Sequence, residues 1–213
     1  MPDLFSKELT AYLESLVPPR PPELAAMEAY GHEHDFPIIG PAAGQCCYLM
    51  ARLISAKRIF ELGSGYGYST AWFARAVIEN GGGTVHHVVW DEKLSARARE
   101  HLDTLGYGGV VGYQVGEAVA ALRAAEGPFD LIFNDINKRD YPASLPVIEE
   151  KLRPGGLLIV DNMLWSGRVY DAGDRSADTD GVRELTRRLT SSGRWALTLV
   201  PIRDGLIVAR KEE

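Results

Sequence analysis

The sequence predicts an α/β fold, with a seven-stranded, mostly parallel sheet, helices on both faces and an antiparallel strand in a C-terminal hairpin. Three observations predict it. Short apolar runs alternate with stretches of helical periodicity from residue 58 onward. The first run leads into a glycine-rich turn, residues 63–67. The last two runs face each other across Arg203-Asp204-Gly205, in which Asp-Gly is typical of a hairpin.

The length and composition suit one globular domain over residues 1–213. Hydrophobic residues make up 46% of the chain and charged residues 24%, which excludes a disordered or fibrous protein. The formal net charge is −6 and no run of lysine and arginine stands out. We therefore expect no nucleic-acid partner.

The chain before the first strand predicts helices at 6–17, 23–34 and 41–56. The proline-rich run 18–22 must end the first of them, because proline removes a backbone donor and clashes with the preceding turn. Residues 1–56 therefore form an N-terminal helical appendage within the single domain.

The elements that follow alternate in type along the chain. Strands are predicted at 58–63, 85–90, 110–115, 129–135, 157–161, 196–202 and 206–210. Helices are predicted at 69–79, 92–105, 117–125, 141–152 and 179–192, with a long loop before the last one. In such a sheet, ligands bind beyond the carboxyl ends of the strands, near the point where the strand order reverses.

The cysteines and the apolar runs of the sequence indicate the cellular compartment of the protein. The two cysteines, Cys46 and Cys47, are adjacent, and neighbours rarely pair because the disulfide would be strained. We expect buried thiols in a reducing compartment. The N-terminus lacks the pattern of a signal peptide, and no apolar run approaches the roughly 20 residues of a membrane helix. These features predict a cytoplasmic protein with no membrane partner.

The turn after the first strand is a candidate ligand loop. Its glycines, Gly63, Gly65 and Gly67, allow a sharp turn and a close approach of backbone to ligand. The helix that follows offers free N–H groups. Tyr68 stands where the dinucleotide fingerprint needs its third glycine, so that fingerprint fails. A tight turn without a ligand is the alternative.

Carboxylates and an amide follow two other strands. Asp135 ends the fourth strand, and Asp161-Asn162 ends the fifth. If these strands are neighbours, the three side chains converge as oxygen ligands for Mg²⁺, Mn²⁺ or Ca²⁺. The alternative is that each aspartate caps a turn or helix. Lys138 could take a proton from a substrate hydroxyl, or be a solvated loop lysine.

Four segments in chain order carry a family resemblance. They are 56–70, 129–141 with its D-x-x-K motif, 152–169 with D-N-x-L-W-x-G-x-V, and 201–206 with P-x-x-D-G. Together they resemble the class I, S-adenosylmethionine-dependent, cation-dependent O-methyltransferases, the group of catechol and caffeoyl-CoA O-methyltransferases and their bacterial relatives. The resemblance implies a Rossmann-like methyltransferase fold, S-adenosylmethionine, a divalent cation (Mg²⁺ before Mn²⁺ or Ca²⁺), an aromatic diol substrate and a homodimer.

The resemblance also implies residue roles. It assigns cofactor contacts to Glu61, Gly63, Ser64, Ser69, Glu117, Ala118 and Asp135. It assigns the cation to Asp135, Asp161 and Asn162, and the general base to Lys138. Trp165 matches an aromatic residue near the acceptor pocket, where it would stack on a substrate ring, although a core tryptophan is the alternative.

One position departs from the family. An acid usually ends the second strand and holds the ribose hydroxyls, but Val89 stands there and cannot accept hydrogen bonds. Asp91, two residues on, is the candidate replacement. Trp90 could cover the adenine or pack under the next helix. This departure motivates one alternative, a catalytically silent protein that binds S-adenosyl ligands. A nicotinamide-dependent Rossmann oxidoreductase is a second alternative, which the alternation of strands and helices permits but which the failed fingerprint and the missing acid count against.

Overall fold

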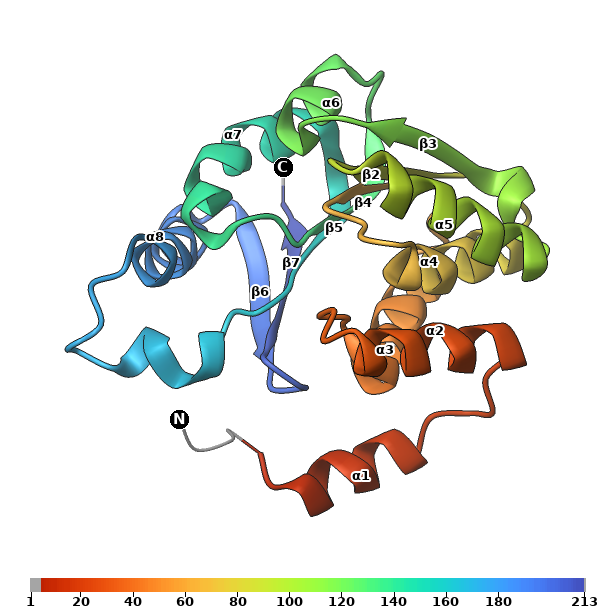
Figure 1. The fold of residues 1–213 in the computed structure, drawn as a ribbon. Coiled ribbons are helices and arrows are strands. Elements are labelled where there is room, and N and C mark those ends of the chain that lie inside the picture. Colours follow the sequence, from red (N-terminus) through yellow and green to blue (C-terminus); the bar gives the residue numbers. More distant parts are fainter. Residues whose placement is uncertain (1–4, 213) are drawn as a thin grey trace.

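A computed structural model describes residues 5–212, and these residues form a seven-stranded sheet in the order β3-β2-β1-β4-β5-β7-β6 (Figure 1). The first four residues of the predicted appendage lie outside this range. β7 is antiparallel to both neighbours and the other adjacent pairs are parallel, so the predicted mostly parallel sheet with its terminal hairpin is confirmed. The strands are β1 (Arg58–Leu62), β2 (Thr84–Val89), β3 (Val111–Val115), β4 (Phe129–Asn134), β5 (Leu152–Val160), β6 (Trp195–Val200) and β7 (Leu206–Lys211).

Helices cover both faces of the sheet (Figure 1). Successive side chains of a strand point to opposite faces, so Ile59 of β1 joins one apolar core and Phe60 joins the other. The first core is covered by α2 (Pro22–Glu33), α3 (Gly40–Leu53), α4 (Tyr68–Glu79) and α5 (Glu92–Thr104). The second is covered by α6 (Ala118–Ala124), α7 (Tyr141–Lys151) and α8 (Ala177–Ser191).

Helix α1 (Lys7–Ser15) stands apart from these layers (Figure 1). It begins at Ser6, whose side chain accepts a hydrogen bond from the Leu9 N–H group. No residue within α1 is buried. Two of its large apolar side chains are exposed, Leu9 at 41% and Tyr12 at 62%.

Two predictions of element boundaries are corrected. β5 begins at Leu152, five residues before the predicted start, because Leu152 pairs with Phe129 before the register shifts and Leu157 pairs with Leu131. The intervening Arg-Pro-Gly-Gly residues are accommodated at that irregularity. The predicted loop from 162 to 178 contains a short 3₁₀ segment, η3 (Trp165–Tyr170).

The strand order places the switch point between β1 and β4. At this edge, the Asp135 N–H group donates to the Leu62 carbonyl (2.9 Å), and the Asp161 N–H group donates to the Asn134 carbonyl (3.2 Å). The carboxyl ends of β1, β4 and β5 are therefore hydrogen-bonded side by side. The segments that follow them in sequence meet in space, as the prediction from Asp135 and Asp161 requires.

Two further features complete the description. Across residues 5–212 we find no helix with both the length and the apolar character needed to cross a bilayer. Cys46 and Cys47 are free thiols on α3, and burial raises the pKa of both.

Candidate active site

A cavity of about 570 Å³ opens at the carboxyl edge of the sheet. The structure brings a large share of the predicted site residues to its walls: Gly63, Ser64, Ser69, Trp90, Asp135, Lys138, Asn162 and Trp165. Other predicted residues lie outside its lining: Glu61, Asp91, Glu117, Ala118 and Asp161. The placement follows the strand order, because β1, β4 and β5 deliver most of the lining from adjacent strand ends.

The glycine-rich turn forms one wall. A Cβ atom at Gly63 would lie 2.5 Å from the Asp135 carbonyl oxygen, and the residue has φ +88°. Only glycine allows this approach of the turn to the end of β4. Ser64 ties the turn to β2, since its N–H group donates to the Val88 carbonyl (2.9 Å) and its Oγ accepts from the Val88 N–H group (3.0 Å).

Glu61 lies beneath this wall and is fully buried. Its carboxylate accepts hydrogen bonds from the hydroxyl groups of Ser69 and Thr70 at the start of α4. Burial raises the pKa of Glu61 to about 7, although these hydroxyl donors oppose the rise. Glu61 thus supports the turn and the start of α4 from below. Its direct contact with a cofactor stays a prediction.

The end of β2 forms the opposite wall. Val89 and Trp90 line the cavity, and Trp90 is 66% exposed. Asp91 caps α5, with its Oδ1 accepting from the N–H groups of Lys93 (2.7 Å) and Leu94 (3.0 Å). Val89, at the position where the resemblance implies a ribose-binding acid, therefore lines the cavity, while the carboxylate of Asp91 caps a helix.

In the turn after β3, the predicted carboxylate also caps a helix. Both carboxylate oxygens of Glu117 accept backbone N–H groups of α6, from Val119 and Ala120. Ala118 is buried beneath that cap. The predicted contacts of Glu117 and Ala118 with the cofactor stay predictions.

Lys138 is held at the floor of the cavity. Its Nζ atom lies 2.7 Å from Asp135 Oδ1 and 3.2 Å from the Ile136 carbonyl oxygen. The residue is 8% exposed, which excludes the alternative of a solvated loop lysine. Helix α8 closes over it at Gly181, where a Cβ atom would lie 2.2 Å from the Lys138 carbonyl oxygen. Nζ also lies 5.8 Å from the Trp165 ring centroid.

Asp161 and Asn162 pair with the turn between β6 and β7. Asp161 Oδ1 accepts from the Asn162 N–H group (2.8 Å), and Oδ2 accepts from Arg203 Nη1 (3.0 Å). Asn162 Nδ2 donates to Asp204 Oδ2 (3.1 Å). Burial and the neighbouring Asp135 charge raise the pKa of Asp161 to about 6, while Arg203 opposes the rise.

The donor set fits a hard divalent cation in its chemistry. The described residues contain no group of three or more His, Cys, Asp and Glu side chains placed to hold a metal. The candidate set instead combines two carboxylates, Asp135 and Asp161, with the Asn162 amide. Within residues 5–212, Asp135 Oδ2 and Asn162 Oδ1 accept no hydrogen bond, so both oxygens remain available as ligands. Lys138 and Arg203 are already paired with the two carboxylates.

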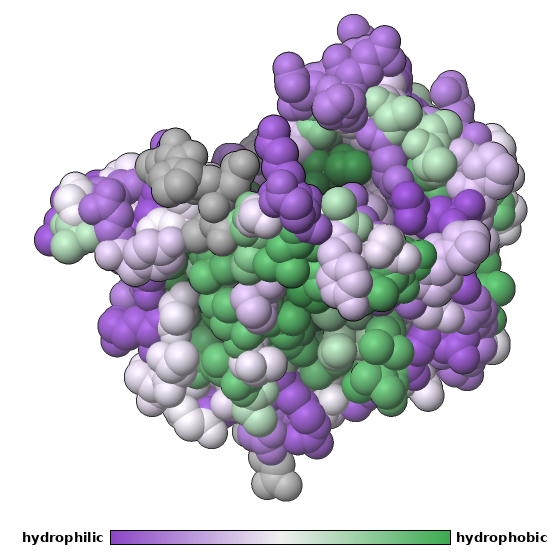
Figure 2. All heavy atoms as spheres, turned by 90° about the horizontal axis from the view of Figure 1, so that it is seen from below, coloured by the Kyte–Doolittle hydropathy of each residue, from purple (hydrophilic) through white to green (hydrophobic). Residues whose placement is uncertain are grey.

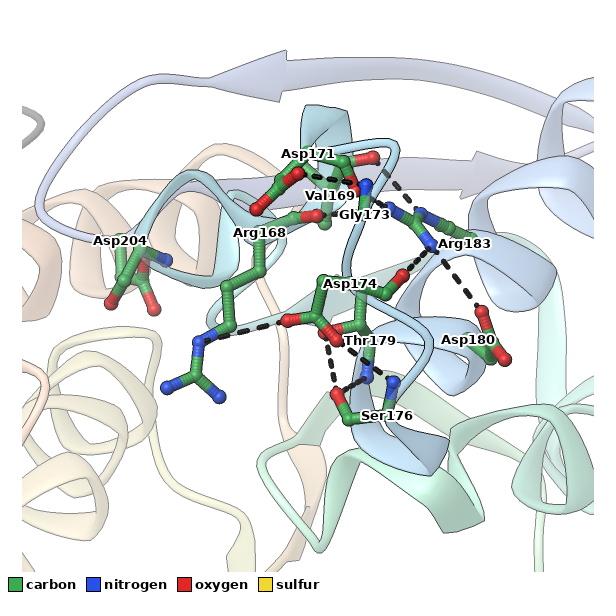
Figure 3. Close-up of polar contacts among 11 residues, drawn as sticks. Arg168, Val169, Asp171, Gly173, Asp174, Ser176, Thr179, Asp180, Arg183 and Asp204 are labelled. Carbon is green, nitrogen blue, oxygen red and sulfur yellow. Dashed lines mark hydrogen bonds and ion pairs between the residues drawn. The ribbon is translucent and has the colours of Figure 1, made fainter. Parts of the chain in front are cut away.

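An arginine of α8 organises the loop after Trp165 (Figure 3). The guanidinium group of Arg183 donates to four main-chain carbonyl oxygens, those of Arg168, Val169, Asp171 and Asp174. The acidic side chains of this loop serve its own backbone, since Asp174 Oδ1 accepts from the N–H group of Ser176 (2.8 Å). The predicted long loop is thus an ordered segment built around the partly buried guanidinium group of Arg183.

A second cavity of about 860 Å³ lies between α1, the start of α3 and the two loops that bear Ser166 and Asp204. Arg203 lines both cavities. Sequence reasoning assigned no role to Arg203 or to Tyr66 and Tyr68, which also line the first cavity. The P-x-x-D-G motif was the available signal for Arg203, because the residue lies inside it.

Solved structures resemble the chain over nearly its full length, and a sequence relative resembles four fifths of it. The O-methyltransferase TomG of Streptomyces achromogenes, involved in tomaymycin synthesis and solved in complex with SAM, has a TM-score of 0.86 at 28% identity, covering 97% of this chain and 96% of that one. An O-methyltransferase of Bacillus cereus in complex with SAH has a TM-score of 0.86 at 25% identity, covering 96% and 97%. A catechol O-methyltransferase of Niastella koreensis is 32% identical over 180 residues, covering 80% of each chain.

These comparisons confirm the family and fold predicted from the four motifs, and they give no support to the nicotinamide oxidoreductase alternative. A family model described as O-methyltransferase matches residues 23–212. The chain belongs to this O-methyltransferase family.

Proposed function

We propose that this protein transfers a methyl group from S-adenosylmethionine to one hydroxyl of a vicinal aromatic diol, with the help of a divalent cation. The observation that carries the proposal is the convergence of Asp135, Lys138, Asn162 and Trp165 on one cavity beside the glycine-rich turn. The SAM and SAH bound to TomG and to the Bacillus cereus enzyme support the choice of cofactor, and the catechol O-methyltransferase of Niastella koreensis supports the choice of acceptor.

The residues of the cavity have different roles in the proposed reaction. Gly63 lets the glycine-rich turn pack directly against the end of β4, and this turn would hold the methionine part of the cofactor. S-adenosylmethionine bound there would supply an electrophilic methyl group, whose bond to sulfur breaks as the bond to the acceptor oxygen forms, with S-adenosylhomocysteine as the leaving group. Lys138 receives the proton of that hydroxyl, and Asp135, 2.7 Å away, stabilises the ammonium group that results. Trp165 offers a face for the aromatic ring. Positioning of the two reactants then contributes much of the acceleration.

Asp135, Asp161 and Asn162 are the residues that would hold the cation. A divalent cation bound there supplies Lewis acidity, which lowers the pKa of an acceptor hydroxyl. The chain itself prepares the ligands. Asp204 takes the Asn162 Nδ2 group and so leaves the amide oxygen free, and burial limits the access of water to Asp161.

The N-terminal helices are proposed to form a homodimer with a second copy of the chain. Leu9, Tyr12 and Leu16, on and just after α1, are exposed, as are Leu49 and Leu53 on α3. Figure 2 shows a broad apolar area on the face of the fold seen from below Figure 1. Such an area marks an interaction surface more often than a solvated one.

The cytoplasmic location stays a prediction.

A methylation assay with catechol, S-adenosylmethionine and Mg²⁺ tests the proposal. We expect product with wild type, loss of product with a chelator, and loss with Asp161→Asn. Asp103→Asn, at an exposed position of α5, is the matched control and should keep its activity. Full activity of Asp161→Asn in the presence of chelator would show that the cation assignment is wrong.

The catalytically silent alternative rests on Val89 alone. It predicts saturable binding of S-adenosylhomocysteine with no methylated product from any diol. The same assay separates the two, because turnover on a single diol eliminates this alternative.

A further inference from the structure

Arg203 occupies an unusual place in the fold. It lies in the turn between β6 and β7 with φ +53°, a left-handed conformation that favours glycine. A residue other than glycine is strained in this backbone conformation, so the contacts of its side chain must offset the strain. The contact that Arg203 makes is with Asp161, through Nη1 and Oδ2 at 3.0 Å.

The two partners differ in their surroundings. The Asp161 side chain is 1% exposed, whereas the Arg203 side chain is 33% exposed and borders both cavities. The carboxylate is fixed at the end of β5, where its Oδ1 accepts the Asn162 N–H group. Arg203 is therefore the member of the pair that has space to move.

The next residue of the turn, Asp204, also contacts the end of β5. Asp204 accepts from Asn162 Nδ2 through one carboxylate oxygen, and from the Ser166 N–H group (2.6 Å) through the other. Two consecutive residues of the β6–β7 turn thus engage two consecutive residues at the end of β5. Asp204 leaves the Asn162 oxygen free, but Arg203 takes an oxygen of Asp161.

We propose that Arg203 is a resident cation that competes with the divalent cation for Asp161 and thereby sets the affinity of the metal site. The inference rests on the cation assignment of the proposed function. In this proposal, a divalent cation that binds Asp161 Oδ2 displaces the Arg203 guanidinium group toward the adjoining cavities. Arg203 is therefore a positioning residue for Asp161, and metal binding is weaker than the three oxygen ligands alone would give.

Arg203→Gly is the informative variant, because glycine accepts the left-handed backbone and the fold should survive. The measurement is Mn²⁺ binding to the full chain, by calorimetry and by the electron paramagnetic resonance signal of free Mn²⁺. We expect affinity to rise by about tenfold or more, equivalent to about 1.4 kcal/mol. Arg203→Lys keeps the charge and should bind within about threefold of wild type.

Arg139→Ala is the matched control. Arg139 also lines the first cavity, but its Nε atom pairs with Asp178 (3.0 Å), away from the proposed ligands. We expect its Mn²⁺ affinity to equal that of wild type. Equal affinity in wild type and Arg203→Gly, or an equal gain in Arg139→Ala, would overturn the role of Arg203 while leaving the cation site standing. No Mn²⁺ binding by any of the proteins would overturn the cation assignment together with the inference.

Discussion

Lys138 Nζ and Asp135 Oδ1 lie 2.7 Å apart across a single short turn after β4. The pair places a nearly buried amine at the floor of the cavity, beneath Trp165. Helix α8 packs closely against the main chain of Lys138 at Gly181. This geometry supports the proposed role of Lys138 as the general base.

Replacing this amine should therefore remove proton transfer without removing the cofactor. We expect Lys138→Met to lower kcat by about 10²–10⁴ and to leave the KM for S-adenosylmethionine nearly unchanged. Steady-state kinetics with a diol acceptor measure both constants. Lys57→Met, at an exposed position before β1, is the control. A Lys138→Met enzyme with wild-type kcat would rule out the base.

The buried carboxylate of Glu61 should make stability depend on pH. Its pKa is raised by burial from 4.5 to about 7 in the folded chain, so folding favours the protonated acid. The stabilisation is present below about pH 4.5 and is lost as the pH rises through about 7. Urea unfolding should show wild type losing up to about 3 kcal/mol relative to Glu61→Gln across this window. A constant difference between the two proteins at all pH values would contradict the burial argument, and Glu100→Gln serves as the exposed control.

The valine at the end of β2 should limit cofactor affinity. Val89 lines the cavity but offers no acceptor for ribose hydroxyl groups. We expect Val89→Asp to bind S-adenosylhomocysteine about tenfold more tightly, since hydrogen bonds to a charged group contribute about 1.5–3 kcal/mol. Val89→Asn, which lacks the charge, should gain less. Calorimetry on both variants decides, and weaker binding by a folded Val89→Asp protein would show that the ribose lies elsewhere.

The four hydrogen bonds by which Arg183 holds the loop after Trp165, here called the Arg183 clamp, should affect binding of the acceptor substrate (Figure 3). Its four main-chain contacts hold the loop that follows Trp165, and lysine cannot reproduce their planar arrangement. We expect Arg183→Lys to raise the acceptor KM several-fold, to lower stability by about 1–3 kcal/mol, and to expose the loop to limited proteolysis. Arg187→Lys, one helical turn later and paired with Glu184, should do none of these. An unchanged proteolysis pattern would argue against the clamp.

Much of the fold followed from local patterns. Residues 129–134 could be predicted as a strand because an apolar run ends at polar residues, and the segment pairs with β1 and β5 in the centre of the sheet. Asp135 and Asp161 could be predicted to meet because the carboxyl ends of neighbouring parallel strands share an edge. The start of β5 could not, because Arg153-Pro154-Gly155-Gly156 reads locally as a turn while long-range pairing with Phe129 brings Leu152 into the sheet.

The site was predictable only in part, because several of its contacts join residues that are far apart in the sequence. The burial of Glu61 depends on Ser69 and Thr70 closing over it, which no local pattern around residue 61 shows. The pairing of Arg203 with Asp161 joins residues 42 positions apart through a turn with left-handed backbone. Glycine spacing and carboxylate positions are local signals, whereas the partners of a buried charge are set by tertiary packing.

Calorimetric titration of the full chain with S-adenosylhomocysteine, with and without Mg²⁺ and with NADH as a control, tests the central claim most directly. The account predicts saturable binding of S-adenosylhomocysteine at one site and no binding of NADH. Absence of S-adenosylhomocysteine binding by the folded protein, at concentrations that saturate Val89→Asp, would contradict a methyltransferase role for the wild-type cavity.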